Sequence, residues 1–134
     1  MRMDFKKLSD EAVSARDNSY SPYSGFKVGA ALCAKSGKIY KGCNIENAAY
    51  SPGICAERAA FAKAVSDGER EFLAIAVAGW GSAPGFAYPC GVCRQVMMEF
   101  CDPASFIIIV TDGPDYRQYT LAELLPHGFG PLSL

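Results

Sequence analysis

Two cysteine-containing segments place the strongest constraint on how this chain can fold. The first reads Cys-Ala-Glu over residues 55–57, and the second reads Pro-Cys-Gly-Val-Cys over residues 89–93. Each follows a loop and opens a stretch that the sequence pattern predicts to be helical. A Cys-x-x-Cys pair at a helix start brings two sulfurs together at the positive end of the helix. A third thiolate from the other segment would require both helix starts to meet at one cation.

Three thiolates from Cys55, Cys90 and Cys93 suit zinc, which forms tetrahedral sites with zinc–sulfur bonds of about 2.3 Å. Three protein ligands leave a fourth position for water, whose pKa zinc lowers toward neutrality. Because three thiolates outweigh the charge of the cation, we expect a compensating donor. Arg58 and Arg94 both lie near a ligand in sequence, and we favour Arg58 as the side chain that donates N–H bonds to sulfur.

Glu57 lies two residues after Cys55, in the predicted first turn of the helix. Positions two apart diverge by about 200° within a helix, so the metal must lie off the helix end for both side chains to reach it. A carboxylate there can take a proton from water, deliver it to a ring nitrogen and then protonate a leaving amine.

Each feature alone also has a simpler interpretation. Cys90 and Cys93 could form a redox dithiol, and a glutamate in a first helical turn often only compensates the helix dipole. A structural zinc site could be closed by a fourth ligand from Cys33, Cys43 or Cys101. Together, however, the two segments match the signature of the zinc nucleobase deaminases, in which His or Cys is the first ligand. The match to that known pattern, and not the spacing alone, makes the combination specific.

Composition bounds the class of protein. The chain has 134 residues, a formal net charge of −1 and 50% hydrophobic residues, which is ordinary for a globular domain, and we expect one catalytic domain over residues 1–134. The absence of a basic run argues against a nucleic-acid partner. Residues 1–7 lack an apolar signal core and the longest apolar run is too short to span a bilayer, so we expect no membrane partner and a reducing, cytoplasmic location.

Hydrophobic periodicity and turn residues predict the elements. The expected helices cover residues 4–18, 55–66, 91–100 and 121–125, the last capped by Thr120. The expected strands cover 26–34, 38–44, 72–80 and 106–110, with a hairpin turn at 35–37 and a loop at 81–89. Continuous apolar runs at 72–80 and 106–110 are typical of strands buried on both faces. This order predicts an α/β sandwich of helices around a mixed sheet.

With these motifs in place, the chain resembles the small homotetrameric cytidine deaminases of nucleoside salvage over nearly its whole length. The resemblance is carried by Ser-Pro-Tyr-Ser-x-Phe at 21–26, Gly-Cys-Asn-Ile-Glu-Asn-Ala at 42–48 and the two cysteine segments. It implies a three-layer α/β/α sandwich with a mixed five-stranded sheet in the order 2-1-3-4-5. It also implies one zinc ion per chain on the three cysteines, with Glu57 as proton shuttle. The implied reaction is hydrolysis of cytidine and deoxycytidine to uridine and deoxyuridine plus ammonia, in pyrimidine salvage.

The same resemblance implies how a free nucleoside substrate is bound. Asn44 and Glu46 would bind the 3′-hydroxyl, and alternate residues of a strand do point the same way. The ring of Phe26 would lie beside the base. The backbone N–H of Ala56 would donate to the 2-oxo group of the base. The backbone carbonyl of Tyr88 would accept a hydrogen bond from the amino group; the family often has Ser at this position.

Two further residues would complete a neighbouring subunit's site. Phe129 would pack on the base and Tyr50 would reach toward the 5′ end of the sugar, so the homotetramer would share its active sites. The tail after Phe129 is short, Trp80 has no assigned role, and His127 is expected to be exposed and not a ligand.

Other functions remain as alternatives. A blasticidin S deaminase is disfavoured by Asn-Ile-Glu-Asn at 44–47, and a polynucleotide deaminase by the lack of basic surface. From other classes, the chain could be an inactive zinc-stabilised interaction module or a dithiol redox protein. Metal content and activity without metal separate these possibilities.

Overall fold

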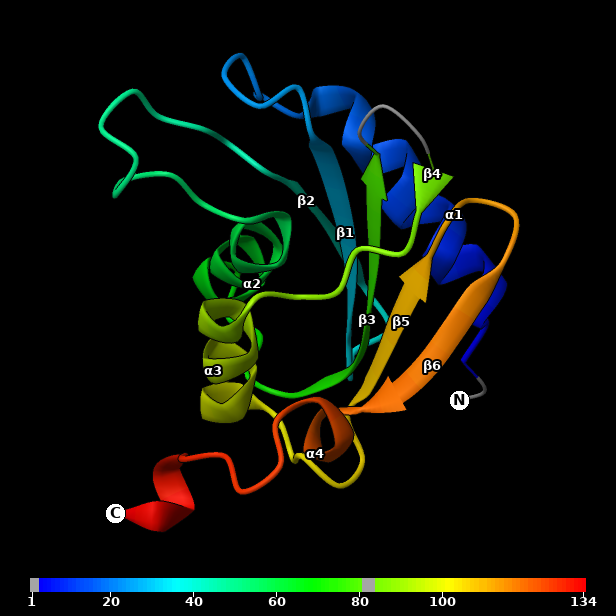
Figure 1. Cartoon of the computed structure of the whole chain (residues 1–134). Coiled ribbons are helices and arrows are strands. Elements are labelled where there is room, and N and C mark those ends of the chain that lie inside the picture. Colours follow the sequence, from blue (N-terminus) through cyan, green and yellow to red (C-terminus); the bar gives the residue numbers. More distant parts are fainter. Residues whose placement is uncertain (1–2, 81–83) are drawn as a thin grey trace.

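The central feature of the fold is a twisted sheet with helices on both faces (Figure 1). The structure is a computed structural model that describes residues 3–80 and 84–134. The start of the chain, residues 1–2, and part of the expected loop, residues 81–83, lie outside the described residues. The strands are β1 (Lys27–Ala34), β2 (Ile39–Cys43), β3 (Phe72–Trp80), β4 (Pro84–Gly85), β5 (Ile107–Thr111) and β6 (Tyr116–Thr120). The helices are α1 (Phe5–Ala15), α2 (Ala56–Ser66), α3 (Gly91–Phe100) and α4 (Leu121–Leu124), with 3-10 turns at Arg16–Asn18 and Pro131–Ser133.

The strand order confirms the predicted topology. The path through the sheet is β2-β1-β3-β5-β6, and the two-residue strand β4 pairs with β3 beside that path. Strands β3 and β5 are parallel, whereas the other pairs are antiparallel, so the sheet is mixed. Hydrophobic patterning located every long strand except β6, because the exposed residues at the start of this edge strand carry no apolar alternation.

The sheet separates two apolar cores. Alternate residues of a strand face opposite sides, so Leu32 packs with α2 and α3 while Ala31 packs with α1. Strand β3 is buried along nearly its whole length, as expected for its continuous apolar run. Helix α4 begins at the predicted cap, where the Thr120 hydroxyl accepts from the backbone N–H of Glu123 over 3.2 Å.

Gly42 fixes how closely α2 approaches the sheet. A Cβ atom at this position would collide with the backbone of Ala56 and Ala60. Because glycine has no Cβ atom, the first turn of α2 can lie directly on β2. This contact sets the position of the helix start that carries Cys55.

Helix length also bears on membrane insertion. Among the described residues, none of the helices combines the length and the apolar character needed to cross a bilayer.

Candidate active site

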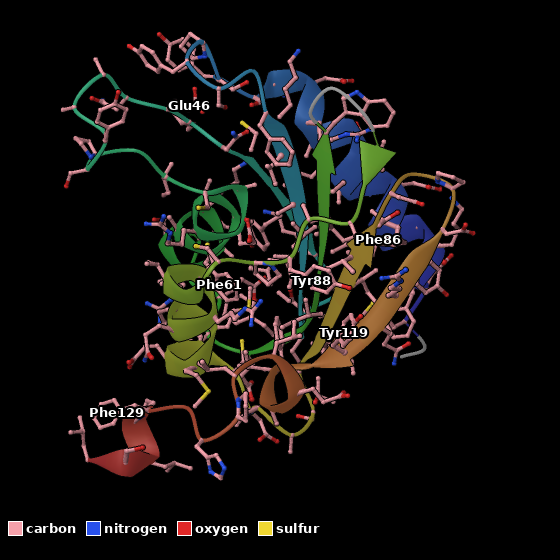
Figure 2. All side chains as sticks on the ribbon, in the orientation of Figure 1. Glu46, Phe61, Phe86, Tyr88, Tyr119 and Phe129 are labelled. Carbon is pink, nitrogen blue, oxygen red and sulfur yellow. The ribbon has the colours of Figure 1, made fainter. Side chains whose placement is uncertain are left out.

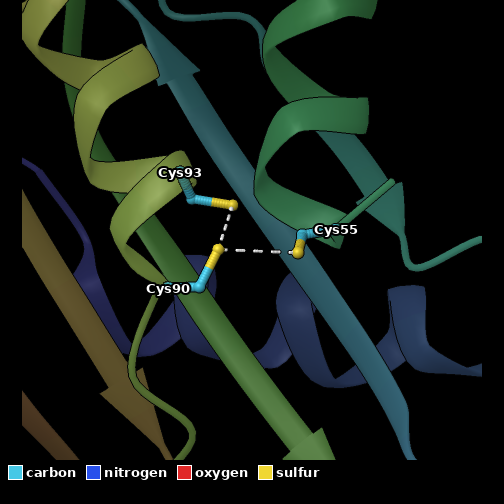
Figure 3. A group of neighbouring side chains, drawn as sticks. All are labelled: Cys55, Cys90 and Cys93. Carbon is cyan, nitrogen blue, oxygen red and sulfur yellow. Dashed lines mark hydrogen bonds between the residues drawn. The ribbon is translucent and has the colours of Figure 1, made fainter. Parts of the chain in front are cut away.

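Helices α2 and α3 begin next to each other, and three cysteine sulfurs meet there (Figure 3). Cys55 is the N-cap of α2, Cys90 is the N-cap of α3, and Cys93 lies in the first turn of α3. The Sγ atoms of Cys55 and Cys90 are 3.8 Å apart, and those of Cys90 and Cys93 are 3.5 Å apart. All three sulfurs lie within 4.8 Å of one another.

This donor set fits a zinc ion. Tetrahedral zinc–sulfur bonds of about 2.3 Å separate ligand sulfurs by about 3.8 Å, close to the spacing observed. In the part of the chain that the structure describes, the metal-capable group contains these three cysteines and no fourth side chain. Cys33 and Cys101 are buried in the apolar cores, and the Cys43 thiol donates to the Asn18 carbonyl over 3.4 Å. Among the described residues, none of the other cysteines is therefore placed to be the fourth ligand of a closed structural zinc site.

Arg58 supplies positive charge to the sulfur cluster. Its Nη2 donates to Cys55 Sγ over 3.4 Å. A hydrogen bond from the Cys93 thiol, together with the Arg58 contact, lowers the pKa of Cys55 to about 5. The pKa of Cys93 is raised because its thiol donates that bond and is buried. These contacts therefore favour the thiolate form at Cys55, while Cys93 keeps its proton.

Arg94, in contrast, contacts backbone carbonyl groups. Its Nε donates to the Pro89 carbonyl over 2.7 Å and its Nη1 donates to the Leu124 carbonyl over 2.5 Å. These bonds tie the start of α3 to the segment before it and to α4. Of the two arginines considered, it is therefore Arg58 that contacts a ligand sulfur.

Glu57 is buried beside the cluster. Only 3% of the residue is exposed, which contradicts the interpretation of a solvent-facing glutamate that compensates the helix dipole. Burial raises the pKa of Glu57 to about 7. A carboxyl group with such a pKa can both accept and release a proton near neutral pH.

A pocket of about 640 Å³ opens over this cluster. It brings together almost all of the residues predicted for the site, although they come from distant parts of the sequence. The predicted residues that line it are Phe26, Asn44, Glu46, Tyr50, Cys55, Ala56, Glu57, Arg58, Tyr88 and Cys90.

Asn44 both faces the pocket and holds its wall. Its Oδ1 accepts from the Val28 backbone N–H over 2.9 Å and from the Ser19 hydroxyl. Its Nδ2 donates to the Phe26 carbonyl over 2.8 Å. Since an amide nitrogen carries two N–H donors, one remains for a ligand.

Glu46 also lines the pocket while its carboxylate is held by neighbouring groups of the wall. The sequence did not predict these contacts. Its Oε1 accepts from the backbone N–H groups of Tyr23 and Ser24 over 2.9 and 3.2 Å. Its Oε2 accepts from the Ser24 hydroxyl over 2.5 Å, and that hydroxyl also accepts from the Phe26 N–H over 3.0 Å. These bonds, led by the Ser24 hydroxyl, lower the pKa of Glu46. The Ser-Pro-Tyr-Ser-x-Phe motif was the available signal for Ser24.

The two residues expected to act across subunits lie at the periphery. Tyr50 is 83% exposed at the rim and has a φ of 62°. Phe129 lies near the C-terminus, far from the labelled Glu46 on the pocket wall (Figure 2), and its carbonyl accepts from Gln95 Nε2 over 2.8 Å. The Phe129 ring is exposed and is absent from the lining of its own pocket. His127 is exposed, as expected.

Comparisons with known proteins agree with this geometry. A family model described as the cytidine and deoxycytidylate deaminase zinc-binding region matches residues 3–109. The chain is 51% identical over 127 residues to a cytidine deaminase from Sporosarcina psychrophila, covering 95% of this chain and 92% of that protein. It is 46% identical over 127 residues to a cytidine deaminase from Halalkalibacterium halodurans, covering 95% of each.

Solved structures show the same fold. The crystal structure of cytidine deaminase from Burkholderia pseudomallei matches with a TM-score of 0.86 and 45% identity, over 95% of this chain and 100% of that one. The cytidine deaminase from Mycobacterium tuberculosis matches with a TM-score of 0.82 and 34% identity, over 96% of this chain and 99% of that one.

Proposed function

Because the chain belongs to the cytidine and deoxycytidylate deaminase family, we propose that it hydrolyses free cytidine and deoxycytidine to uridine and deoxyuridine with release of ammonia. One observation carries the proposal. The buried Glu57 carboxyl and three clustered cysteine sulfurs lie together beneath one pocket. Pyrimidine salvage is the metabolic role that these products serve.

Cys55, Cys90 and Cys93 are the residues that would hold one zinc ion. When bound, zinc acts as a Lewis acid and makes a water molecule acidic enough to attack near neutral pH. Arg58 offsets part of the negative charge of the sulfurs through its bond to Cys55. That bond keeps the site from becoming too electron-rich to activate water.

Glu57 carries the protons of the reaction. Its carboxylate accepts a proton from the water that attacks C4 of the base and delivers that proton to ring N3. It then transfers the second proton of the water to the leaving amino group, and the C4–N bond breaks to release ammonia. The pKa of about 7 suits a group that must accept and donate in one cycle.

The pocket wall would orient the nucleoside. The remaining N–H of Asn44 donates to the 3′-oxygen, while the 3′-hydroxyl donates to Glu46. The Phe26 ring lies beside the base. At the floor, the Ala56 N–H donates to the 2-oxo group of the base, and the Tyr88 carbonyl accepts a hydrogen bond from its amino group.

The proposed assembly is a cytoplasmic homotetramer of chains that each form one catalytic domain over residues 1–134. Phe129 is exposed and remote from its own pocket, so it is available to a neighbouring copy, and Tyr50 lies at the rim where a neighbour would meet it. A reducing compartment keeps the three ligand thiols free of disulfide bonds.

Ultraviolet-monitored turnover tests the proposal. Cytidine, deoxycytidine, cytosine and blasticidin S are assayed with protein whose zinc content is measured in the same sample. We expect turnover of both nucleosides with about one zinc ion per chain. Zinc without turnover would favour an inactive module, and thiol redox activity without metal would favour the dithiol alternative.

A further inference from the structure

Residues 86–90 join β4 to α3 and carry Cys90 to the site, yet they belong to no helix or strand. In Figure 1 this segment crosses the α2–α3 face of the sheet before it enters α3. Tyr88, in the middle of the segment, lines the pocket. The position of this part of the pocket wall therefore depends on side-chain contacts.

Edge strand β6 provides such contacts through Arg117 and Tyr119. The hydroxyl oxygens of Tyr88 and Tyr119 are 2.8 Å apart, and their ring centroids are 5.6 Å apart at 62°. Arg117 Nη1 donates to the Tyr88 oxygen over 3.3 Å, and its guanidinium carbon lies 4.0 Å from the centroid of the Phe86 ring. Figure 2 shows Phe86, Tyr88 and Tyr119 on the same side of the sheet.

The contacts follow from strand geometry. Residues 117 and 119 share one face of β6 because side chains alternate along a strand. Tyr116 belongs to the other face, where its ring makes an edge contact with Phe5 of α1 at 6.4 Å. The ladder between β5 and β6 fixes the strand, so the two side chains extend from a rigid element to an irregular one.

A second tie holds the far end of the segment. The Pro89 carbonyl accepts from Arg94 of α3, next to Cys90. The β6 contacts thus fix Phe86 and Tyr88, whereas Arg94 fixes the residue adjoining the metal ligand. Loss of the β6 contacts should move the pocket wall more than the sulfur.

We propose that Tyr119 and Arg117 are positioning residues for the substrate, which act by holding the segment 86–90, and with it Tyr88, at the pocket wall. The proposal rests on the proposed function, because the Tyr88 carbonyl is the group assigned there to the amino group of the base. Arg117 and Tyr119 are not among the residues that line the pocket. Their effect is on substrate affinity and reaches the site through the segment 86–90.

Steady-state kinetics of Tyr119→Phe tests the proposal. This variant keeps the ring contact and removes the hydroxyl. We expect KM for cytidine to rise about three- to tenfold, with kcat within about twofold and zinc content unchanged. Arg117→Met should act in the same direction, and Arg117→Lys should restore part of the loss because it returns a donor. Because Tyr88→Phe removes both the bond to Tyr119 and the bond from Arg117, the double variant Tyr88→Phe/Tyr119→Phe should resemble Tyr88→Phe alone.

Tyr116→Phe is the matched control, because it removes a hydroxyl from the opposite face of the same strand and should leave KM unchanged. Wild-type KM in both Tyr119→Phe and Arg117→Met, even with a lower melting temperature, would reduce the pair to a structural role and overturn the proposal. Calorimetric titration with uridine separates the two proposals. A wild-type chain that neither binds uridine nor converts cytidine would remove both, whereas normal wild-type behaviour with unaffected variants would remove only this one.

Discussion

The guanidinium of Arg58 lies 3.4 Å from the sulfur of Cys55, although both residues belong to the same helix start. Cys55 precedes α2 as its N-cap, and Arg58 lies in the first turn, so the side chain can turn back toward the sulfur. This is the contact that ties a positive charge to the metal-capable cluster.

Arg58→Gln should reduce kcat by about tenfold or more, because a hydrogen bond to a charged group contributes about 1.5–3 kcal/mol. The pH–rate profile should shift as well, since the sulfurs become more electron-rich. Arg70→Gln is a suitable control because Arg70 donates to the backbone carbonyls of Val65 and Glu69 and not to a cysteine sulfur among the described residues. An unchanged pH profile in the Arg58 variant would exclude the charge-compensating role.

Glu57→Gln should keep its fold and zinc content but lose turnover by about two to four orders of magnitude, because both proton transfers fail. Circular dichroism, zinc analysis and single-turnover kinetics measure the three properties separately. Glu99→Gln, an exposed change on α3, should behave like the wild type. Near wild-type turnover in the Glu57 variant would refute the proton-shuttle mechanism.

Ser24→Ala should raise KM about three- to tenfold with little change in kcat, because its hydroxyl joins Glu46 of the proposed sugar site to the Phe26 backbone. A matched control is Ser105→Ala, which removes a similar bond to Asp102 in a distant turn. Steady-state kinetics on cytidine distinguishes the two. An equal KM in both variants would show that the hydroxyl only shapes the loop.

Tyr40→Phe should weaken the fold without altering the site. The Tyr40 hydroxyl bonds to Asp67 and Glu69, and with Lys38 it lowers the pKa of Asp67. A lowered carboxyl pKa gives stability that is present above the unfolded-state pKa and is lost as pH falls through the folded-state value. We expect a melting temperature roughly 3–6 °C lower at neutral pH, with the gap closing in acid. A constant gap down to low pH would contradict this account.

Gly42→Ala should destabilise the chain by about 1–3 kcal/mol, because the added methyl group meets the backbone of α2. Zinc affinity should fall too, as the start of the helix is displaced. Gly85→Ala provides the comparison, since a Cβ atom there meets no heavy atom within 4 Å. Denaturant unfolding with zinc titration measures both effects. Wild-type zinc affinity in the Gly42 variant would show that the Gly42 contact does not position the zinc ligands.

The long elements and the sulfur cluster could be predicted from sequence, for different reasons. Strand β3 was located because burial on both faces demands an uninterrupted apolar run. The cysteines and Glu57 were predicted to share a site because they match a known catalytic pattern, whereas their spacing alone left redox and closed-zinc alternatives open. The edge strand β6 was missed because its exposed polar residues carry no periodic signal.

The unpredicted contacts share one physical property. The bonds of Ser24 to Glu46 and of Tyr88 to Tyr119 each join two polar side-chain groups that are distant in sequence. Hydrophobic periodicity carries no information about such pairs, and their partners become known only when the chain is folded.

The pocket has a floor made from two helix starts and a wall made from loops that Asn44 and Glu46 fasten together. In the proposed function the loop wall binds the sugar, whereas the floor and the segment 86–90 bind the base, so sugar recognition and chemistry lie in separable parts of the chain. Protein engineers could therefore vary the loop positions around Asn44 and Glu46 to admit nucleosides with other sugars, while the reacting centre is inherited intact.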